Sequence, residues 1–96
     1  GLRSELTYGG RAPCNLGPLL QFEQAYDDNL ARIYGFFVYR LGSRDDAEDL
    51  TQLTFERALR AWDRFDPRRS TVGAWLIAIA RNLLIDRHRR RGLLRF

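Results

Sequence analysis

The residues best suited to chemistry in this sequence are arginines near its end. The stretch IARNLLIDRHRRR, residues 79–91, runs from an apolar helical pattern into a basic tract. Guanidinium groups bind phosphates through paired hydrogen bonds, and Asn82 offers both a donor and an acceptor to a base edge. The arginines spaced to follow a phosphate backbone are Arg68, Arg69, Arg81, Arg87, Arg89, Arg90 and Arg91. This spacing predicts binding of a nucleic acid.

Charge is distributed unevenly along the chain of 96 residues. Residues 1–66 carry eight arginines against eleven acidic residues, a net charge of −3. Residues 67–96 carry eight arginines against Asp86 alone, a net charge of +7. All sixteen basic residues are arginine, which codon bias explains more simply than selection for guanidinium chemistry. The asymmetry predicts a polyanionic partner for the C-terminal third.

The residue types give little support to catalysis or metal binding. His88 is the one histidine and lies in the arginine-rich tract, and Cys14 is the one cysteine. These two residues cannot form a zinc set or an internal disulfide. Charges at a helix start explain the carboxylates within residues 45–49 better than acid–base chemistry does. We therefore expect no enzyme activity, no metal and no cofactor.

The first eighteen residues hold four of the eight glycines and two of the three prolines, without a sustained period. We expect residues 1–18 to be a loose leader, partly a remnant of cloning, with room for a short extra helix. Arg3, Glu5 and Arg11 interrupt any signal-peptide core, and no apolar run is long enough to span a bilayer. These features predict a cytoplasmic protein, and no function is assigned to Cys14.

The sequence predicts two helices between residues 19 and 64. Apolar residues recur at steps of three and four through residues 19–41, which predicts an amphipathic helix that ends at Gly42. Ser43 stands three residues before Asp46, an acidic form of the capping box. A second helix should therefore run over residues 44–64.

The second predicted helix has an apolar arc and a charged face. The apolar arc holds Ala47, Leu50, Thr51, Thr54, Phe55, Ala58, Ala61 and Trp62. The opposite face holds Asp46, Asp49, Leu53, Glu56, Arg57 and Arg60. Leu53 is the misfit there, either a tolerated exposure or the anchor of a docking site. Because the acidic part of this face would repel phosphate, we expect it to meet another protein.

The segment FDPRRST, residues 65–71, interrupts the helical pattern because Pro67 lacks a backbone donor and disfavours helical geometry at Asp66. Ser70 or Thr71 can cap a third helix that continues to about residue 91. Its inner stripe is predicted to hold Val72, Trp75, Leu76, Ile79 and Leu83. Nothing alternates with the period of a strand. The predicted fold is all-α, a compact bundle of three main helices in residues 19–92 with a tail at 93–96.

The basic loop at residues 65–71 favours binding of an unstacked nucleic-acid base. Arg68 and Arg69 lie close in sequence to Phe65 and Trp75, and single-strand binders combine cations with aromatic rings in this way. Core packing is the simpler role for Trp75, because it lies on the predicted inner stripe. Phe65 should be more open.

Two stretches resemble a known family. They are DDAEDLTQLTFERALRAWDRFD at 45–66 and WLIAIARNLLIDRHRRR at 75–91, and they closely resemble the promoter-recognition domain of extracytoplasmic-function (ECF) sigma factors of bacterial RNA polymerase. The resemblance covers residues 22–91, about three quarters of the chain. Its specificity lies in the combination of an acidic helix start with D-L-x-Q-x-x-F, W-L, I-A-R-N and D-x-x-R at these spacings.

The resemblance implies two binding surfaces. One docks on the clamp helices of the polymerase largest subunit, and its matching positions are Asp46, Asp49, Gln52, Leu53, Glu56 and Arg57. The other captures a base flipped from the non-template strand of the promoter minus-ten element. Its candidates are Arg68, Arg69, Ser70, Thr71, Arg81 and Asn82, with Arg87, Arg89, Arg90 and Arg91 at phosphates. An anti-sigma factor that covers the same surfaces is a further implied partner.

The sequence departs from the family pattern in two ways. Leu53 stands where members usually carry an acidic residue. The chain also stops just past the basic tract, whereas the family continues into a second helical domain for the minus-thirty-five element, so we expect a fragment or a stand-alone reader. Two other functions stay open: a helical domain bound by a regulator without direct DNA reading, and a helix-turn-helix reader of duplex DNA. The proline-containing loop and the long second helix fit the last one less well.

Overall fold

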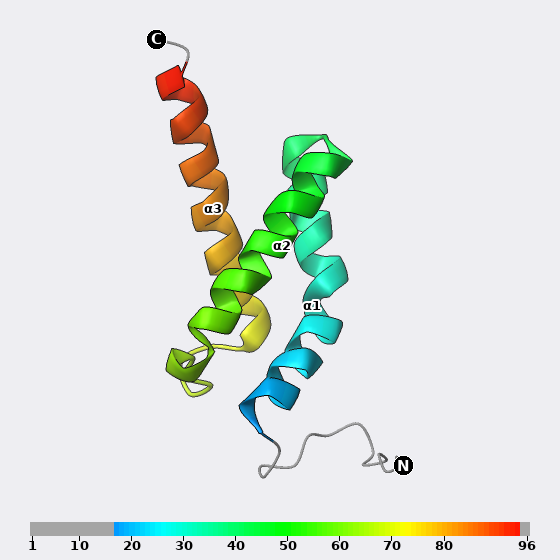
Figure 1. Ribbon diagram of the computed structural model, residues 1–96, viewed down its shortest axis with the longest axis vertical. Coiled ribbons are helices and arrows are strands. Elements are labelled where there is room, and N and C mark those ends of the chain that lie inside the picture. Colours follow the sequence, from blue (N-terminus) through cyan, green and yellow to red (C-terminus); the bar gives the residue numbers. More distant parts are fainter. Residues whose placement is uncertain (1–16, 95–96) are drawn as a thin grey trace.

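The computed structural model describes residues 17–94, with only the backbone for residues 92–94. Within that range the chain forms α1 (Pro18–Leu41), α2 (Arg44–Arg60), a short 3₁₀ helix η1 (Trp62–Arg64) and α3 (Val72–Leu94) (Figure 1). No strand occurs among these residues. The prediction of an all-α fold with three main helices is confirmed.

The predicted leader falls almost entirely outside the described residues, together with Cys14 and the extra N-terminal helix. Of the leader, the structure describes Gly17 and Pro18. α1 begins at Pro18, one residue earlier than predicted. Proline suits this position, because the first turn of a helix leaves its N–H groups without partners in any case.

α1 and α2 form a tight antiparallel hairpin that local chemistry explains. Gly42 ends α1 in the left-handed region with φ of 68°, and its N–H donates to the Val38 carbonyl oxygen at 2.9 Å. Ser43 caps α2, since its Oγ accepts a hydrogen bond from the Asp46 N–H at 3.3 Å. Both ends of this turn agree with the prediction.

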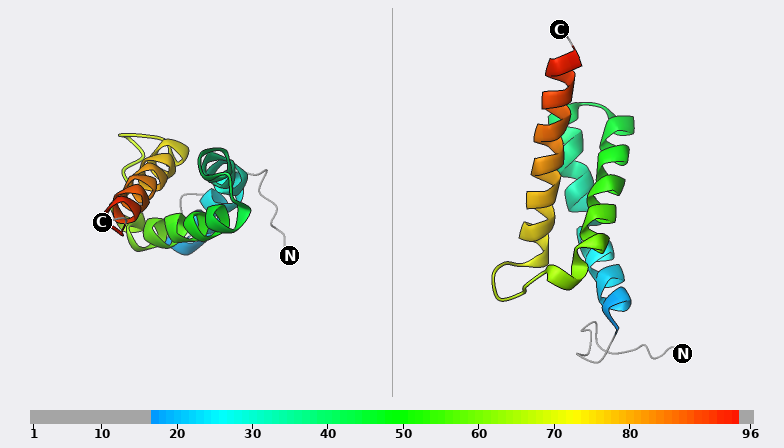
Figure 2. Two further views of the ribbon diagram at one scale, coloured as in Figure 1. Left: turned by 90° about the horizontal axis from the view of Figure 1, so that it is seen from above. Right: turned by 60° about the vertical axis from the view of Figure 1, so that its left-hand side comes forward.

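An apolar core lies where the three helices meet. Seen from above, α2 runs alongside both α1 and α3 (Figure 2, left). The core side chains with little or no exposed surface are Ile33, Phe37, Ala47, Phe55, Ala58, Leu76, Ala80 and Leu83. The predicted apolar arc of α2 is confirmed over residues 47–58, because its six members there are all buried. Leu53, on the opposite face, keeps 39% of its surface exposed.

The second helix ends earlier than predicted, at Arg60 instead of Arg64. Residues three apart lie on the same side of a 3₁₀ helix, and this geometry brings Trp62 and Phe65 together. Their rings stack with centroids 5.6 Å apart and an interplanar angle of 9°. Trp62 also meets Phe22 of α1 edge to face, at 5.3 Å between centroids. This tertiary packing of Trp62 is absent from the periodic pattern, so the predicted boundary was wrong.

α3 is turned about its axis relative to the prediction. Its buried residues are Gly73, Leu76, Ala80, Leu83 and Leu84, whereas Val72, Trp75 and Ile79 of the predicted inner stripe are only partly buried. At Gly73 the side chains of Arg32 and Asn29 from α1 lie against α3, and an added Cβ would lie 2.6 Å from Nη1 of Arg32. The small residues Gly73 and Ala80 allow this face to turn inward, which a count of large apolar residues does not reveal.

The C-terminal part of α3 leaves the bundle. Leu84 is its last buried residue, and none of residues 85–91 is buried. In Figure 1 this end, drawn in red, diverges from the α1–α2 hairpin and projects beyond it. The arginine-rich tract therefore begins beside α2, where Arg87 pairs with Asp46, and continues on a helix end without buried residues in 85–91.

Candidate nucleic-acid and protein interfaces

The loop before α3 is a compact turn organised by Asp66. The Asp66 carboxylate accepts hydrogen bonds from the Arg68 backbone N–H at 2.9 Å and from Arg68 Nε at 3.2 Å. The Arg69 N–H donates to the Asp66 carbonyl oxygen at 3.0 Å. In Figure 2 (right) the yellow loop stands away from the helices. The Arg68 side chain is 89% exposed, so its ion pair with Asp66 is weak and open to exchange.

The two loop hydroxyls proposed to bind DNA have local partners. Thr71 Oγ1 accepts a hydrogen bond from the Ala74 N–H at 3.1 Å and so caps α3, as the sequence predicted for Ser70 or Thr71. Ser70 Oγ donates to the Thr71 carbonyl oxygen at 3.2 Å. The exposed Arg69 side chain has no ion pair with any described residue. Of the four loop candidates, Arg68 and Arg69 extend furthest into solvent.

Three aromatic rings stand between the loop and the core. Phe65 lies 5.0 Å from Trp75, and Trp62 lies 5.9 Å from Trp75, measured between ring centroids. Phe65 and Trp75 are both partly buried. Phe65 is therefore less open than expected, because it stacks on Trp62.

A cationic pocket of about 470 Å³ lies between the end of α2 and the first half of α3. Its lining residues are Arg57, Arg60, Ala61, Arg64, Trp75, Ile79 and Asn82. Asn82 was predicted as a base contact, and it shares this pocket with the ring of Trp75. None of the four loop candidates lines the pocket, and Arg81 is exposed outside it.

The cationic pocket contains residues that the sequence reasoning missed. Arg60 and Arg64 were not proposed as site residues, and Trp75 was assigned to the core. Arg57, Arg60 and Arg64 follow one another at steps of three and four, which places them on one side of a helical segment. This spacing is the sequence pattern from which Arg60 and Arg64 could have been predicted as site residues.

The arginines at the end of α3 differ in their partners. Arg87 Nη2 donates to Asp46 Oδ2 at 2.8 Å, with both side chains partly buried. Arg90 pairs with Asp86 one turn earlier at 3.3 Å, and its side chain is 75% exposed. Arg89 and Arg91 are exposed and form no ion pair with the described residues. The structure thus joins Arg87, a proposed phosphate contact, to Asp46, a proposed polymerase contact.

The other proposed polymerase contacts lie on the outer surface of α2. Asp49, Gln52, Leu53, Glu56 and Arg57 are all exposed. Gln52 and Glu56 border a groove toward α1, whereas Leu53 and Arg57 border a pocket toward α3. The predicted face is therefore divided between two sides of the helix.

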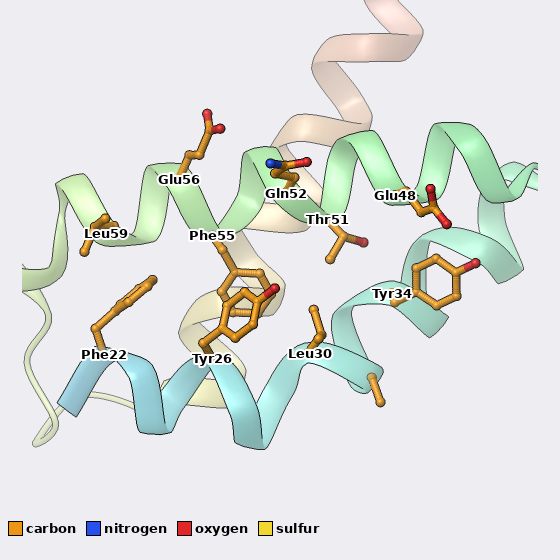
Figure 3. Close-up of a pocket in the computed structure, with 11 residues that line it drawn as sticks. Phe22, Tyr26, Leu30, Tyr34, Glu48, Thr51, Gln52, Phe55, Glu56 and Leu59 are labelled. Carbon is orange, nitrogen blue, oxygen red and sulfur yellow. The ribbon is translucent and has the colours of Figure 1, made fainter. Parts of the chain in front are cut away.

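The groove between α1 and α2 has a volume of about 720 Å³. Figure 3 shows Phe22, Tyr26 and Leu30 pointing from α1 toward α2, with Phe55 facing them. The Tyr26 and Phe55 rings meet edge to face at 4.7 Å between centroids. Gln52 and Glu56 lie on the α2 side, and the Glu56 carboxylate points away from α1 (Figure 3). The groove is thus an aromatic cleft with a polar and acidic edge.

The described residues form neither a metal-ligand cluster nor a membrane-spanning helix. No group of three or more histidine, cysteine or acidic side chains there is placed to hold a metal ion. No helix in the described part of the chain is both long and apolar enough to cross a membrane.

Residues 25–93 match the family described as Sigma-70 region 2. The chain belongs to the Sigma-70 region 2 family. The match includes every residue proposed above for DNA or polymerase binding, and it begins within α1. The family resemblance drawn from the sequence is confirmed.

Relatives of this region 2 chain carry the name of ECF RNA polymerase sigma factors. It is 45% identical over 65 residues to BldN of Streptomyces coelicolor, an alignment that covers 68% of this chain and 25% of the relative. It is 44% identical over 73 residues to SigE of Mycolicibacterium smegmatis, covering 71% and 28% respectively. For SigX of Bacillus subtilis the identity is 32% over 74 residues, covering 77% and 38%.

The chain spans between a quarter and two fifths of the length of these three relatives. No solved structure matches it. The comparisons therefore assign region 2 to this chain and leave the rest of each relative without a counterpart here.

Proposed function

We propose that this chain is the part of an ECF sigma factor that binds core RNA polymerase and recognises and helps melt the promoter minus-ten element. Membership of the Sigma-70 region 2 family and the names of the relatives support this proposal. The protein acts without an enzymatic step of its own, and its place of action is the cytoplasm, where transcription occurs.

The cationic pocket is the observation that carries the DNA-binding part of the proposal. It combines three guanidinium groups with the ring of Trp75 and the amide of Asn82. Guanidinium groups suit phosphates, an aromatic ring suits stacking, and an amide can pair with a base edge. No single one of these features is specific, but their combination fits one nucleotide.

Base capture supplies free energy for opening the duplex. Unstacking one base costs a few kcal/mol, and stacking on an aromatic side chain returns about 1–3 kcal/mol per base. Hydrogen bonds from Asn82 and phosphate contacts from the arginines add to that return. Arg68, Arg69 and Arg81 lie outside the pocket, where they can hold the strand on either side of the captured base.

The acidic part of α2 is proposed to dock on the clamp helices of the polymerase largest subunit. Asp49, Gln52 and Glu56 are exposed on α2, and the arginines of the cationic pocket begin at Arg57. Asp49 lies well before that pocket, which keeps its negative charge away from the bound DNA strand. The aromatic groove beside Gln52 and Glu56 provides apolar contact area for the same protein partner.

A direct test compares two arginine pairs in binding a fluorescent single-stranded oligonucleotide of the non-template minus-ten sequence. We expect the Arg60→Ala, Arg64→Ala double variant to flatten the slope of log K against log salt by about 1.4, because each phosphate contact on a single strand contributes about 0.7. The Arg68→Ala, Arg69→Ala variant is the matched comparison from the loop.

The outcome separates two positions for the base. If only the loop variant weakens binding, capture occurs at residues 66–71 and the cationic pocket is not the site. If the wild-type chain shows no salt-dependent binding at all, the DNA-reading proposal fails. Asn82→Ala in the full-length parent protein, supplied with core polymerase, should reduce promoter opening measured by permanganate reactivity of unpaired thymines.

A regulator-bound helical domain that does not read DNA is the second candidate function. The aromatic groove between α1 and α2 favours it, since an exposed apolar cleft of this kind suits a protein partner. An anti-sigma factor seated there would be compatible with both functions. A flat salt dependence of oligonucleotide binding together with tight binding of such a regulator would favour the second candidate.

A further inference from the structure

A smaller surface between α2 and the C-terminal part of α3 has chemistry of a different kind. We name it the leucine–arginine seat, a hollow of about 280 Å³. Its lining residues are Leu50, Leu53, Arg57, Leu83, Asp86, Arg87, Arg90 and Arg91. Leu50 and Leu83 are buried and form its base, whereas Leu53 is 39% exposed. An apolar hollow is thus surrounded by guanidinium groups.

The seat carries an excess of available positive charge. Arg57 and Arg91 are exposed and have no ion pair with any described residue. Arg90 pairs with Asp86 at 3.3 Å, but its side chain is 75% exposed, and such pairs along an exposed helix are weak. Arg87 is the exception, because Asp46 holds it at 2.8 Å. Three of the four guanidinium groups can therefore turn toward a new partner.

We propose that the leucine–arginine seat binds an acidic, aliphatic peptide segment of a partner protein. Carboxylates pair with guanidinium groups through two parallel hydrogen bonds, which satisfies the arginines around the hollow. An aliphatic side chain between those carboxylates removes Leu53 from water. A phosphate backbone would satisfy the same arginines but would gain nothing from the leucines, so charge and apolar surface together favour the peptide.

An occupant of this seat would affect both activities of the proposed function, on which this consequence rests. It would cover Leu53 and Arg57, which are candidate polymerase contacts. It would also cover Arg90 and Arg91, which are candidate phosphate contacts. One short peptide segment can therefore exclude polymerase and DNA from the same side of the molecule. It does so without reaching the aromatic groove, and it meets the cationic pocket at Arg57, which lines both surfaces.

The test uses a fluorescein-labelled helical peptide with leucine at successive turns and glutamate between them. Its binding to the 96-residue chain is followed by anisotropy. Two control peptides carry alanine in place of every leucine or glutamine in place of every glutamate. We expect each control to bind at least about fivefold more weakly, a difference of about 1 kcal/mol.

Matched variants of the chain locate the binding site. Leu53→Ala should weaken peptide binding about fivefold, whereas Ile85→Ala should change it less than about twofold. Ile85 is the matched control because it is 44% exposed on α3 and lies outside the seat. Arg91→Ala should likewise weaken the peptide, and Arg89→Ala should not. Circular dichroism spectra and melting curves verify that each variant is folded.

A single-stranded oligonucleotide bound to the same variants separates this proposal from the proposed function. Leu53→Ala should leave oligonucleotide affinity unchanged. If Leu53→Ala weakens the oligonucleotide as much as the peptide, the seat belongs to the DNA surface and the proposal is wrong. It is equally wrong if the alanine-substituted peptide binds as well as the parent, or if the parent peptide does not bind below about 1 mM. Absence of oligonucleotide binding would instead count against the proposed function alone.

Discussion

Two buried threonines three residues apart on α2 meet different hydrogen-bonding conditions. Thr54 Oγ1 donates to the Leu50 carbonyl oxygen at 2.7 Å. Thr51 Oγ1 is also buried but has no hydrogen-bond partner. A buried hydroxyl without a partner costs free energy because it has lost its bonds to water. Thr51 is therefore a weak point of the α2 face that packs on α1.

Replacing Thr51 by valine keeps the shape of the side chain and removes the unpaired hydroxyl. We expect Thr51→Val to raise the free energy of unfolding by about 1 kcal/mol, measured by urea denaturation. Thr54→Val is the matched control and should lower it by a similar amount, because that change removes a hydrogen bond. A loss of stability in Thr51→Val would mean that its hydroxyl does find a partner in solution.

The hairpin turn depends on the backbone conformation of one glycine. Gly42 has φ of 68°, a region that costs residues with a side chain about 1–2 kcal/mol. We expect Gly42→Ala to lower the free energy of unfolding by about 1 kcal/mol in the same measurement. Gly35→Ala, within α1 and with no atom within 4 Å of the added methyl group, should raise it by about 0.5–1 kcal/mol. Equal effects of the two changes would contradict this interpretation of Gly42.

At the scale of whole elements, one ion pair ties the start of α2 to the end of α3. Asp46 and Arg87 are 41 residues apart in sequence, and their side chains are joined at 2.8 Å. Each was proposed to contact a different macromolecule. While the pair is intact, Arg87 is less available to phosphate and Asp46 is less available to polymerase. Binding of polymerase at Asp46 should therefore free the Arg87 side chain, and binding of DNA at Arg87 should free the Asp46 carboxylate.

Asp46→Asn tests this coupling because it frees Arg87 with almost no change of shape. We expect the slope of log K against log salt for a single-stranded oligonucleotide to steepen by about 0.7, the contribution of one additional phosphate contact. Asp45→Asn removes the same charge from a neighbouring exposed residue and is the matched control. If both variants change the slope equally, net charge explains the effect and the ion pair has no special role.

Local signals made the helices and their caps predictable. The left-handed Gly42, the Ser43 cap and the buried arc of α2 follow from residues within a few positions of one another. The end of α2 and the orientation of α3 depend on contacts between distant segments, namely Trp62 with Phe22 and Gly73 with Arg32. Periodicity within one element cannot contain that information.

The candidate site was predictable to a similar extent. Asn82 was proposed because its amide offers both a donor and an acceptor to a base edge, and it does line a pocket. Arg60 and Arg64 were missed because the second helix was expected to run to residue 64, with Arg60 on its outward charged face and not beside the third helix. The Asp46–Arg87 pair could not be predicted, since its two residues meet only when α2 and α3 are packed together.

At the scale of the whole molecule, the apolar groove and the arginine-rich surfaces lie on different sides of α2. The aromatic groove lies on the α1 side, while the cationic pocket and the leucine–arginine seat lie on the α3 side. A partner in the groove therefore leaves the cationic pocket open. In the function proposed above, polymerase in the groove and a DNA strand in the cationic pocket would thus lie on different sides of α2.

Among the described side chains of residues 85–91, none is buried, and Arg87 and Arg90 form ion pairs. We expect amide hydrogens of residues 85–91 to exchange much faster than those of residues 76–84, as measured by mass spectrometry. An oligonucleotide should slow exchange in 85–91 and leave 76–84 unchanged. Uniform protection along α3 before addition of the oligonucleotide would contradict this expectation.

The last turns of α3 continue a longer helix, but none of residues 85–91 is buried, and arginines four residues apart, such as Arg87 and Arg91, repel one another. A row of phosphates would screen that repulsion and lower the free energy of the helical form. The tip of α3 should thus reach its final rigidity only on the nucleic acid. Part of the binding free energy would then be used to order a tip that is already helical in the unbound structure, which keeps the contact readily reversible.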